Sequence, residues 1–350
     1  MKVDQVLCAA GPVDAVTNQA LAYRRLFDGW GWEGTDYAEV IAPTMEGGLV
    51  KPLRSLAGDR GGGVLLVHYS GYTPAIGPLL GNGRPSLLIS HNITPAKYMW
   101  DQEPFEGVRC SLAPDQLAEL AQRADAVAGV SEFNAGELRV SAGRDDVSVI
   151  PVLFDRSRLG SPGGEVAAAR GPRVLFVGRL APHKRQDLVI RAFAGLRRLC
   201  PEARLTLVGV PISGAFEAGL RGLADELAPG AVTFESGIAP EALWDRYRSA
   251  DVFLCLSEHE GFCIPLLEAF HFGVPVVARA AGAVGEVVGD AGVLLSPDDD
   301  LTTIAEVLRI VVSDPELVSE LRLRGERRLA VYDHELTAAR LREQLTILAG

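Results

Sequence analysis

The chain has 350 residues, of which 48% are hydrophobic and 23% are charged, as in ordinary globular proteins. A single hydrophobic core usually stops growing at about 250–300 residues, so this length predicts two domains. The formal net charge of −11 argues against a nucleic-acid-binding protein, because such proteins usually present a basic face.

The first half of the chain alternates short apolar runs with helical patterns. Strands are predicted at 3–10, 63–70, 86–92, 125–131 and 147–152. Helices are predicted at 17–31, 115–124 and 131–143, the last beginning with a serine cap and ending on a glycine.

A stretch rich in Gly, Ser and Pro, 157–172, is the predicted linker, and the alternation restarts after it. Strands are predicted at 173–178, 204–209, 232–236, 251–257 and 275–279. Helices are predicted at 185–199, 215–228, 240–250, from Pro265 onward, and at 334–349.

Strand–helix alternation in both halves predicts an α/β fold of two doubly wound parallel-sheet, Rossmann-like domains, 1–156 and 173–333. Ligands bind such sheets at the carboxyl ends of the strands, so we expect the domains to face a central cleft. The C-terminal segment, 334–350, is predicted to cross back to the first domain.

Five scattered cysteines, with no Cys-x-x-Cys pair, are typical of reduced thiols rather than of a disulfide or zinc framework. The first apolar stretch is too short for the core of a signal peptide, and no uncharged run approaches the ~20 residues that span a bilayer. We therefore expect a cytoplasmic protein that does not associate with membranes.

Two cations follow the predicted strand 173–178. Arg179 and Lys184 lie on the loop that leads into the next helix. A helix N-terminus presents unpaired N–H groups and a partial positive charge, so this loop is a candidate phosphate site. Two solvated surface charges are the alternative.

The segment SEHEGFCIPLLEAF, 257–270, includes the carboxylates Glu260 and Glu268, separated by seven residues. They could form an acid/base pair, a metal site, two solvated charges or a clamp on a polar ligand. Pro265 suits the first helical position, which places Glu268 in the first turn and the residues from Glu260 to Cys263 in a loop. A carboxylate accepts hydrogen bonds from two hydroxyls, as a sugar diol requires, but glutamate near a helix start also compensates the helix dipole.

Two longer segments carry a family resemblance. VGRLAPHKRQDLVIRAF, and SEHEGFCIPLLEAFHFGVPVVARAAGAVGEVVGDAGVLL after it, resemble the donor-binding half of the family 4 retaining glycosyltransferases, which have the GT-B fold. The Glu-x7-Glu spacing is that family's signature. The resemblance is strong over 173–300 and looser, but in register, over the first domain.

This resemblance implies roles for the charged residues. Arg179 and Lys184 would neutralise the leaving diphosphate, Glu268 would hold the ribose hydroxyls, and Glu260 would bind a hydroxyl of the donor sugar. His91, at the end of the predicted strand 86–92, matches the family's active-site histidine and would contact the donor sugar or the reacting region.

The resemblance also implies backbone contacts to the donor, from the amides of Gly261, Phe262 and Cys263, from Ile238 beside the nucleobase, and from Gly11. Gly11 departs from the family, in which paired glycines are common at this place. Asp14 and Asn18 would instead contact the acceptor, and the segment HYSGY, 68–72, could line the cleft.

The function implied is a retaining glycosyltransferase that moves a hexosyl group from a nucleoside-diphosphate sugar, such as a UDP- or GDP-hexose, to a hydroxyl acceptor. The acceptor would be a small molecule, a glycan or a glycolipid; no oligomeric state is predicted. Same-face attack, in which the leaving phosphate takes the acceptor's proton, needs no metal, protein nucleophile or cofactor. A GT-B sugar-nucleotide epimerase and a non-catalytic nucleotide-sugar-binding protein are the alternatives.

Overall fold

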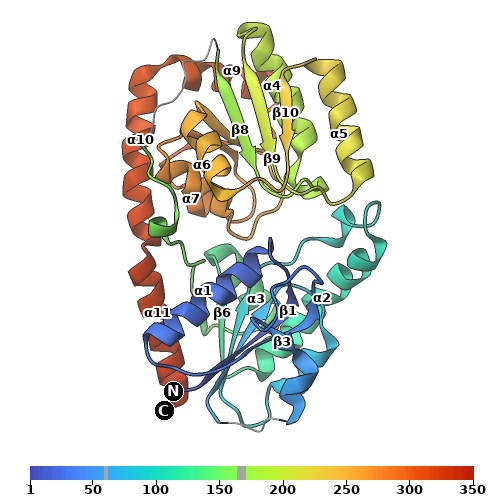
Figure 1. Cartoon of the computed structure of the whole chain (residues 1–350), viewed down its shortest axis with the longest axis vertical. Coiled ribbons are helices and arrows are strands. Elements are labelled where there is room, and N and C mark those ends of the chain that lie inside the picture. The colour runs from blue at the N-terminus through green and yellow to red at the C-terminus, as the bar shows by residue number, and fades with distance from the viewer. Residues whose placement is uncertain (59–61, 164–170) are drawn as a thin grey trace. The chain divides into compact units, whose positions relative to one another are not determined.

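The computed structural model describes residues 1–58, 62–163 and 171–350. The chain divides into two compact units, Met1–Leu153 with His334–Gly350, and Phe154–Asp333. Within the described residues each unit holds one parallel sheet with helices around it, so the predicted pair of doubly wound domains is confirmed (Figure 1). The predicted linker falls within the second unit, and its residues 164–170 lie outside the described residues.

The first unit is built on a seven-stranded sheet with the order β3-β2-β1-β4-β5-β6-β7. Its strands are β1 (Val3–Ala10), β2 (Asp36–Ile41), β3 (Lys51–Pro52), β4 (Val64–Tyr69), β5 (Ser86–Ser90), β6 (Ala126–Gly129) and β7 (Val147–Val149). Its helices are α1 (Ala15–Gly29), α2 (Pro104–Arg123), α3 (Glu132–Ala142) and α11 (His334–Ala349). The last helix of the chain therefore belongs to the same unit as the first strand.

The two faces of this sheet follow from the alternation of side chains along a strand. Val6 and Cys8 of β1 join a buried core with α2 and α3. Leu7, on the opposite face, packs with Ala20 of α1. Helix α11 contacts β4 and β5, and its Leu341 and Leu345 are fully buried.

Helix α2 differs from its predicted extent, because it begins at Pro104 and continues through Pro114. Proline inside a helix removes one backbone hydrogen bond and usually marks a boundary, which explains the prediction of a start at 115. Ala113 and Leu117, on either side of this proline, are buried against the sheet. Their burial offsets the lost hydrogen bond and keeps the helix continuous.

The second unit is built on a six-stranded sheet with the order β10-β9-β8-β11-β12-β13. Its strands are β8 (Arg173–Val177), β9 (Arg204–Val208), β10 (Val232–Glu235), β11 (Val252–Cys255), β12 (Val276–Arg279) and β13 (Val293–Leu295). Its helices are α4 (Gln186–Leu199), α5 (Gly214–Leu227), α6 (Pro240–Ser249), α7 (Ile264–His271), α8 (Val284–Val288), α9 (Leu301–Ser313) and α10 (Pro315–Leu329).

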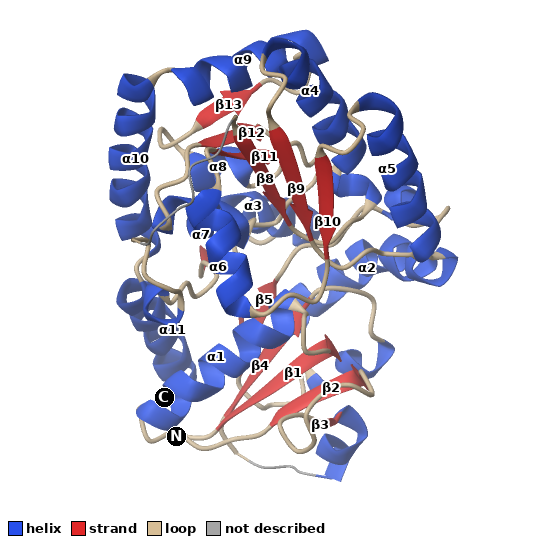
Figure 2. Ribbon diagram, turned by 45° about the horizontal axis from the view of Figure 1, so that its top comes forward, coloured by secondary structure: helices blue, strands red, loops and turns tan. Residues whose placement is uncertain are grey.

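Successive side chains of β11 again point to opposite faces of the sheet. Val252 and Leu254 join the core that α4, α5 and α9 cover. Phe253, between them in sequence, faces the other layer and stacks on Tyr247 of α6, with ring centroids 6.1 Å apart. Figure 2 shows α4 and α5 running beside β9 and β10. The second sheet is therefore covered by helices on both faces.

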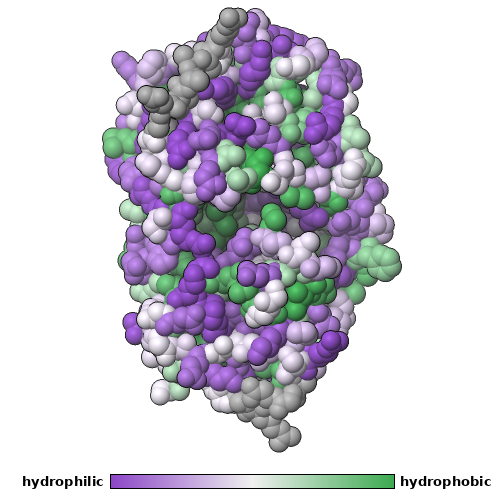
Figure 3. Space-filling model, viewed as in Figure 1, coloured by the Kyte–Doolittle hydropathy of each residue, from purple (hydrophilic) through white to green (hydrophobic). Residues whose placement is uncertain are grey.

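The outer surface mixes residue types. Figure 3 shows hydrophilic and hydrophobic residues interspersed on the face that it displays. The large hydrophobic residues most exposed, Phe105, Val140 and Val13, are scattered along the chain. None of the helices in the described residues combines the length and the apolar run that crossing a bilayer requires.

Candidate active site

The strand order identifies where each sheet can bind a ligand. In a doubly wound sheet the binding crevice forms outside the carboxyl ends of the strands, where the strand order reverses. In the second unit this reversal lies between β8 and β11. Arg179 follows β8, and Glu260 follows β11. Two of the predicted site residues therefore flank the switch point.

The loop after β8 is held by a side chain that the sequence analysis did not identify. Gln186, the first residue of α4, donates from Nε2 to the carbonyl of Arg179 at 3.0 Å and accepts from the amide of Ala181 at 3.3 Å. Arg179 is exposed on this loop, and Lys184 ends a short 3-10 helix, Pro182–Lys184. The buried amide of Gln186 thus fixes the path of the loop that carries both predicted cations.

Lys184 and Glu260 form a buried ion pair. Nζ of Lys184 lies 2.6 Å from Oε2 of Glu260, and their side chains are 19% and 7% exposed. Burial opposes both charges, but the attraction between them prevails: it raises the pKa of Lys184 above its ordinary value and lowers that of Glu260. Both groups are charged at neutral pH, so Glu260 is not placed to act as a proton donor.

Three loops at the carboxyl end of this sheet are tied together through their backbones. The amide of Glu258 donates to the carbonyl of His183 at 2.8 Å, which joins the loops after β8 and β11. The amide of Ala283 donates to the carbonyl of Glu260 at 2.9 Å, which adds the loop after β12. Gly282 has φ +56°, and a Cβ there would lie 2.3 Å from the Glu260 carbonyl oxygen. Only glycine permits this close approach.

Glu268 lies one position further along its helix than predicted. Helix α7 begins at Ile264, so Pro265 is its second residue and Glu268 is the fifth, outside the first turn. Proline is accepted there because the first-turn N–H groups need no partner within the helix. The hydroxyl of Tyr247, on α6, donates to Oε2 of Glu268 at 2.6 Å. Burial raises the pKa of Glu268, and the Tyr247 hydrogen bond partly opposes that shift.

The loop between Glu260 and α7 presents unused backbone donors. The N–H groups of Gly261, Phe262 and Cys263 donate to no acceptor among the described residues. Cys263 caps α7 in the left-handed conformation, with φ +74°. The Phe262 ring packs edge-on against Tyr332, with centroids 5.3 Å apart. These N–H groups can donate hydrogen bonds to an anionic or carbonyl oxygen at the start of the helix.

The remaining predicted donor contact of the second unit is Ile238. It follows β10, the edge strand, which β9 separates from β8. Ile238 is half-buried, and Gly237 before it has φ +64°. Ile238 therefore follows a strand that lies two places from β8 in the sheet.

One group of side chains has the composition of a metal site. Potential ligand atoms of Cys255, Glu260 and Cys263 lie within 4.8 Å of one another. The ammonium group of Lys184 already binds the Glu260 carboxylate, and its positive charge opposes a second cation. The residues present fit a metal ion poorly, and metal-independent action stays a prediction.

The predicted site residues of the first unit lie at the carboxyl edge of its sheet. Gly11 follows β1, His91 follows β5, and the strand order reverses between β1 and β4. A Cβ on Gly11 would make ordinary contacts with Ala42 Cβ at 3.7 Å and Asp14 Cβ at 4.0 Å, so nothing among the described residues of this unit requires glycine there. Asp14 caps α1 by accepting from the Thr17 amide at 2.7 Å, which gives it a structural role besides the predicted acceptor contact.

The prediction for the segment 68–72 is wrong at its first two residues. His68 and Tyr69 are fully buried and do not line a surface. Nδ1 of His68 instead lies within hydrogen-bonding distance of Nε2 of His91, at 2.8 Å. The alternation of β4 turns His68 toward α1, where Tyr23 lies against its ring with centroids 5.6 Å apart.

A cavity of the second unit lies elsewhere. An open cavity of about 550 Å³ is lined by the starts of β8 and β9, by β10 and by α6, including Arg173, Arg204 and Arg246. Because the functional end of a doubly wound sheet is the carboxyl end, we place more weight on the loops around Glu260 than on this cavity.

The second unit carries a family match. Residues 165–328 match the glycosyl transferases, group 1. The resemblance predicted from the Glu-x7-Glu segment is thereby confirmed, and the matched residues include Arg179, Lys184, Glu260 and Glu268.

Curated proteins are similar in sequence to part of this chain. A D-inositol 3-phosphate glycosyltransferase of Kineococcus radiotolerans is 34% identical over 200 residues, covering 52% of this chain and 44% of that protein. A GDP-mannose-dependent alpha-(1-6)-phosphatidylinositol monomannoside mannosyltransferase of Mycolicibacterium smegmatis is 33% identical over 186 residues, covering 50% and 48%. The chain thus spans less than half the length of these relatives.

Solved structures match the whole fold. Sucrose-phosphate synthase of Thermosynechococcus elongatus superposes with a TM-score of 0.78 at 20% identity, over 99% of this chain and 98% of that one. HepE of Anabaena, in complex with UDP-glucose, superposes with a TM-score of 0.72 at 18% identity, over 99% of both chains. These similarities confirm the predicted GT-B fold.

Several supporting residues had no distinct signal in the sequence. Gln186 and Tyr247 sit on amphipathic helices, where a polar or aromatic residue is unremarkable, and Gly282 is one of 38 glycines. Gln5 and His68 did leave a signal, because each interrupts an apolar strand with a polar side chain. Because buried polar groups are almost always hydrogen-bonded, a polar residue within an apolar strand indicates a buried hydrogen-bond partner.

Proposed function

We propose that this chain is a retaining, metal-independent glycosyltransferase that moves a hexosyl group from a nucleoside-diphosphate sugar to a hydroxyl acceptor. The observation that carries the proposal is the Lys184–Glu260 ion pair at the switch point of the second sheet, with Arg179 on the same loop as Lys184. This arrangement lies inside the segment that matches the glycosyl transferases.

The donor side follows from charge and hydrogen-bonding capacity. The Lys184 ammonium has three N–H groups, and the Glu260 contact uses one of them, so others remain for phosphate oxygens. Arg179 adds a planar donor that binds phosphate in a two-pronged manner. Glu268 offers Oε1 to the ribose hydroxyls while Tyr247 holds Oε2. A carboxylate held this way has a fixed orientation toward a diol.

The reaction needs stabilisation of charge at two places. Breaking the glycosyl–phosphate bond builds positive charge on the anomeric carbon and negative charge on the departing diphosphate. Fixed cations at the diphosphate stabilise this separation more than they stabilise the bound substrate. In same-face attack, the acceptor oxygen bonds to the anomeric carbon, the carbon–phosphate oxygen bond breaks, and the phosphate oxygen receives the acceptor's proton.

The names of the relatives suggest donors to test first. GDP-mannose appears in the name of the mycobacterial relative, and UDP-glucose was bound to HepE. Acceptors of the relatives include an inositol phosphate and a phosphatidylinositol mannoside. We therefore propose UDP- or GDP-hexoses as donors and a small polyol, glycan or glycolipid as acceptor.

The test is a thermal-shift panel of UDP, GDP, ADP, CDP and dTDP, each with magnesium or with EDTA. We expect one diphosphate to stabilise the wild type equally in both conditions and to have a much smaller effect on Arg179→Ala. Arg198→Ala, an exposed arginine at the far end of α4, is the matched control and should respond like the wild type. No shift with any diphosphate would contradict the donor site.

Turnover separates the transferase from its alternatives. With the identified donor, a transferase forms a product whose anomeric configuration, read by proton NMR, matches that of the donor only when an acceptor is present. An epimerase converts the donor without any acceptor, and a binding protein leaves it unchanged. The ion-paired Glu260 favours the transferase, because an epimerase needs carboxylates that exchange protons.

A further inference from the structure

A buried chain of polar side chains crosses the first sheet and ends at His91. Nε2 of His91 lies 2.8 Å from Nδ1 of His68, and Nε2 of His68 lies 2.8 Å from Oε1 of Gln5. Nε2 of Gln5 donates to Oδ1 of Asp36 at 2.9 Å. Arg24 pairs with that carboxylate at 2.6 Å. Gln5 and His68 have no exposed surface, so these contacts are shielded from water.

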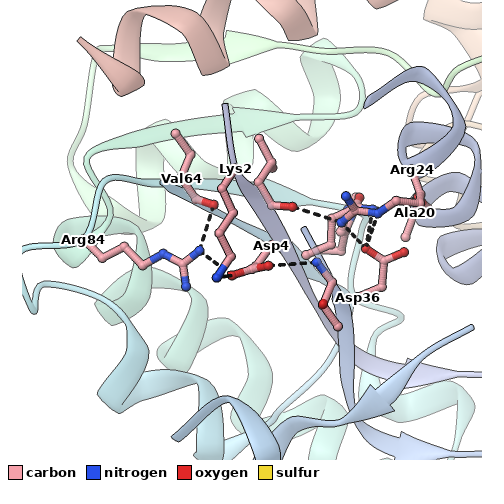
Figure 4. Close-up of polar contacts among 11 residues, drawn as sticks. Lys2, Asp4, Ala20, Arg24, Asp36, Val64 and Arg84 are labelled. Atoms are coloured by element: carbon pink, nitrogen blue, oxygen red, sulfur yellow. Dashed lines mark hydrogen bonds and ion pairs between the residues drawn. The ribbon is translucent and has the colours of Figure 1, made fainter. Parts of the chain in front are cut away.

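Strand register explains why these residues meet. In the parallel pairing Gln5 of β1 stands opposite Asp36 of β2, so both side chains lie on the same face. Leu7, two residues after Gln5, stands opposite His68 of β4, which puts His68 on that face as well. Helix α1 covers this face and contributes Arg24. Figure 4 shows Arg24 and Ala20 beside Asp36.

The direction of every hydrogen bond follows from Gln5. Its Nε2 faces two acceptors, the Asp36 carboxylate and the carbonyl of Ala20 at 2.9 Å. Rotating the amide by half a turn would set its oxygen against both, so the nitrogen belongs there. Oε1 of Gln5 then faces His68 as an acceptor, and Nε2 of His68 must carry a proton.

The assignment passes from His68 to His91. A neutral imidazole carries one proton, so with Nε2 of His68 protonated its Nδ1 is an acceptor, and Nε2 of His91 must donate to it. Burial keeps both rings neutral, because it lowers the pKa of His68 well below its ordinary value and that of His91 to about 3. Nδ1 of His91 is left with a lone pair, and it forms no hydrogen bond within the described part of the first unit.

We propose that Gln5, His68 and the Arg24–Asp36 pair are positioning residues that hold His91 as its Nε2–H tautomer, so that its Nδ1 accepts a hydrogen bond from a ligand hydroxyl. A lone pair attracts a hydroxyl donor and repels a phosphate or carboxylate oxygen. The site therefore selects a hydroxyl-bearing part of a substrate, not a phosphate. The hydroxyl is a sugar hydroxyl if the proposed function holds, whereas the tautomer is a property of the protein alone.

The first test is a nitrogen-15 NMR spectrum of the histidine-labelled full chain, with no ligand present. His91→Asn assigns the His91 signals by their loss. We expect Nε2 of His91 to be protonated and Nδ1 to have the far-downfield shift of a bare imidazole nitrogen. A protonated Nδ1, a cationic ring or a mixture of tautomers would overturn the proposal. Should no variant fold, a wild-type spectrum in which no histidine combines a protonated Nε2 with a bare Nδ1 would still overturn the proposal.

The second test asks whether the hydrogen bonds from Gln5 through His68 impose the tautomer of His91. Gln5→Met removes the amide at similar volume and should shift His91 toward a mixture of tautomers. Gln116→Met is the matched control. The Gln116 amide also forms hydrogen bonds within the first unit, to Thr73 and Tyr69, but it is not one of the residues linked to His91. An unchanged His91 spectrum in folded Gln5→Met would refute the positioning role.

A kinetic measurement links the tautomer to the ligand. With the donor sugar nucleotide identified by the thermal-shift panel, Gln5→Met should lower kcat/KM by roughly tenfold, the size of one lost hydrogen bond. Inhibition by the matching nucleoside diphosphate should be unchanged, because the side chains proposed to bind it, Arg179, Lys184 and Glu268, belong to the second unit. An equal loss in kcat/KM and in affinity for the nucleoside diphosphate would contradict a hydroxyl contact at His91. Failure of the diphosphate panel would instead contradict the proposed function and leave the NMR result intact.

Discussion

At the scale of single residues, the second unit is organised by pairs of side chains whose contacts the sequence does not show. Glu268 belongs to the Glu-x7-Glu segment, but Tyr247, which donates to it, comes from a different helix. Lys184 and Glu260 were both candidates, but nothing in their spacing along the chain shows that they bind each other. Each pair makes the charge or orientation of one residue depend on the other.

Tyr247→Phe tests the first of these pairs. Removing the hydroxyl leaves Oε2 of Glu268 without its donor, so the carboxylate loses its fixed orientation. We expect the affinity for the stabilising nucleoside diphosphate to fall by about 1 kcal/mol. Isothermal titration calorimetry measures this. Tyr37→Phe, in the first unit, is the control, and an equal loss in both variants would show a general effect of removing a hydroxyl.

The Lys184–Glu260 pair is tested by a double-mutant cycle. Lys184→Met leaves a carboxylate buried without its counter-ion, which typically costs about 3–5 kcal/mol of unfolding free energy. Glu260→Gln likewise leaves the Lys184 ammonium group buried without its counter-ion. The double variant should lose less unfolding free energy than the two single variants lose together, because it leaves no unpaired buried charge. Urea unfolding followed by tryptophan fluorescence measures each value, and additive costs would show that the pair does not couple.

At the scale of elements, loops at the carboxyl ends of strands carry the site, and backbone contacts join them. The loop of Glu260 is tied on one side to His183 and on the other to Ala283. A short helix, α8, starts immediately after the second contact. The position of Glu260 therefore depends on the conformation of the loop after β12.

Gly282→Ala tests this dependence. The new Cβ would lie 2.3 Å from the Glu260 carbonyl oxygen, at a residue with φ +56°, so the backbone must move. We expect a loss of at least about 1 kcal/mol of unfolding free energy, together with weaker diphosphate binding. Gly285→Ala is the matched control. No atom lies within 4 Å of its added Cβ, and alanine in α8 should be neutral or stabilising.

If Gly282→Ala binds the diphosphate as tightly as the wild type, the contact between these loops does not position Glu260. A similar loss in Gly285→Ala would point instead to general disturbance of α8.

At the scale of the whole molecule, buried histidines set how stability depends on pH. Burial lowers the pKa of His91 and of His183 to about 3, and Lys184 adds to the effect at His183. The pKa of His68 is also far below its ordinary value of 6.5. Between the folded and unfolded pKa values the unfolded chain binds protons that the folded chain excludes. The free energy of unfolding therefore rises with pH in this range.

We accordingly expect stability to fall as the pH drops below about 6.5, with each buried histidine contributing up to about 1.4 kcal/mol per pH unit. Urea unfolding at several pH values from about 5 to about 7 measures the slope. His91→Asn should reduce the slope, whereas His334→Asn, at a partly exposed position, is the control. An unchanged slope in folded His91→Asn would show that His91 takes up no proton on unfolding.

Much of the secondary structure was predictable, because apolar runs bounded by glycine, proline or capping residues determine local structure. Strand β1 has the predicted limits, and α3 has the predicted serine cap at Ser131 and glycine end at Gly143. Strands β2, β3 and β13 and helices α8 to α10 were not predicted. Lys51–Pro52 is too short to show a period, and its pairing with β2 comes from the sheet.

The sequence by itself determined the α/β alternation, the two parallel sheets and the family signature around Glu260 and Glu268. These features depend on local periodicity and on motif spacing, which a single chain displays. Only the tertiary structure decided which polar groups meet: Lys184 with Glu260, Tyr247 with Glu268, and the chain from Arg24 to His91. Such partners are joined by strand order and register, and a shift of one residue would turn each strand residue to the opposite face.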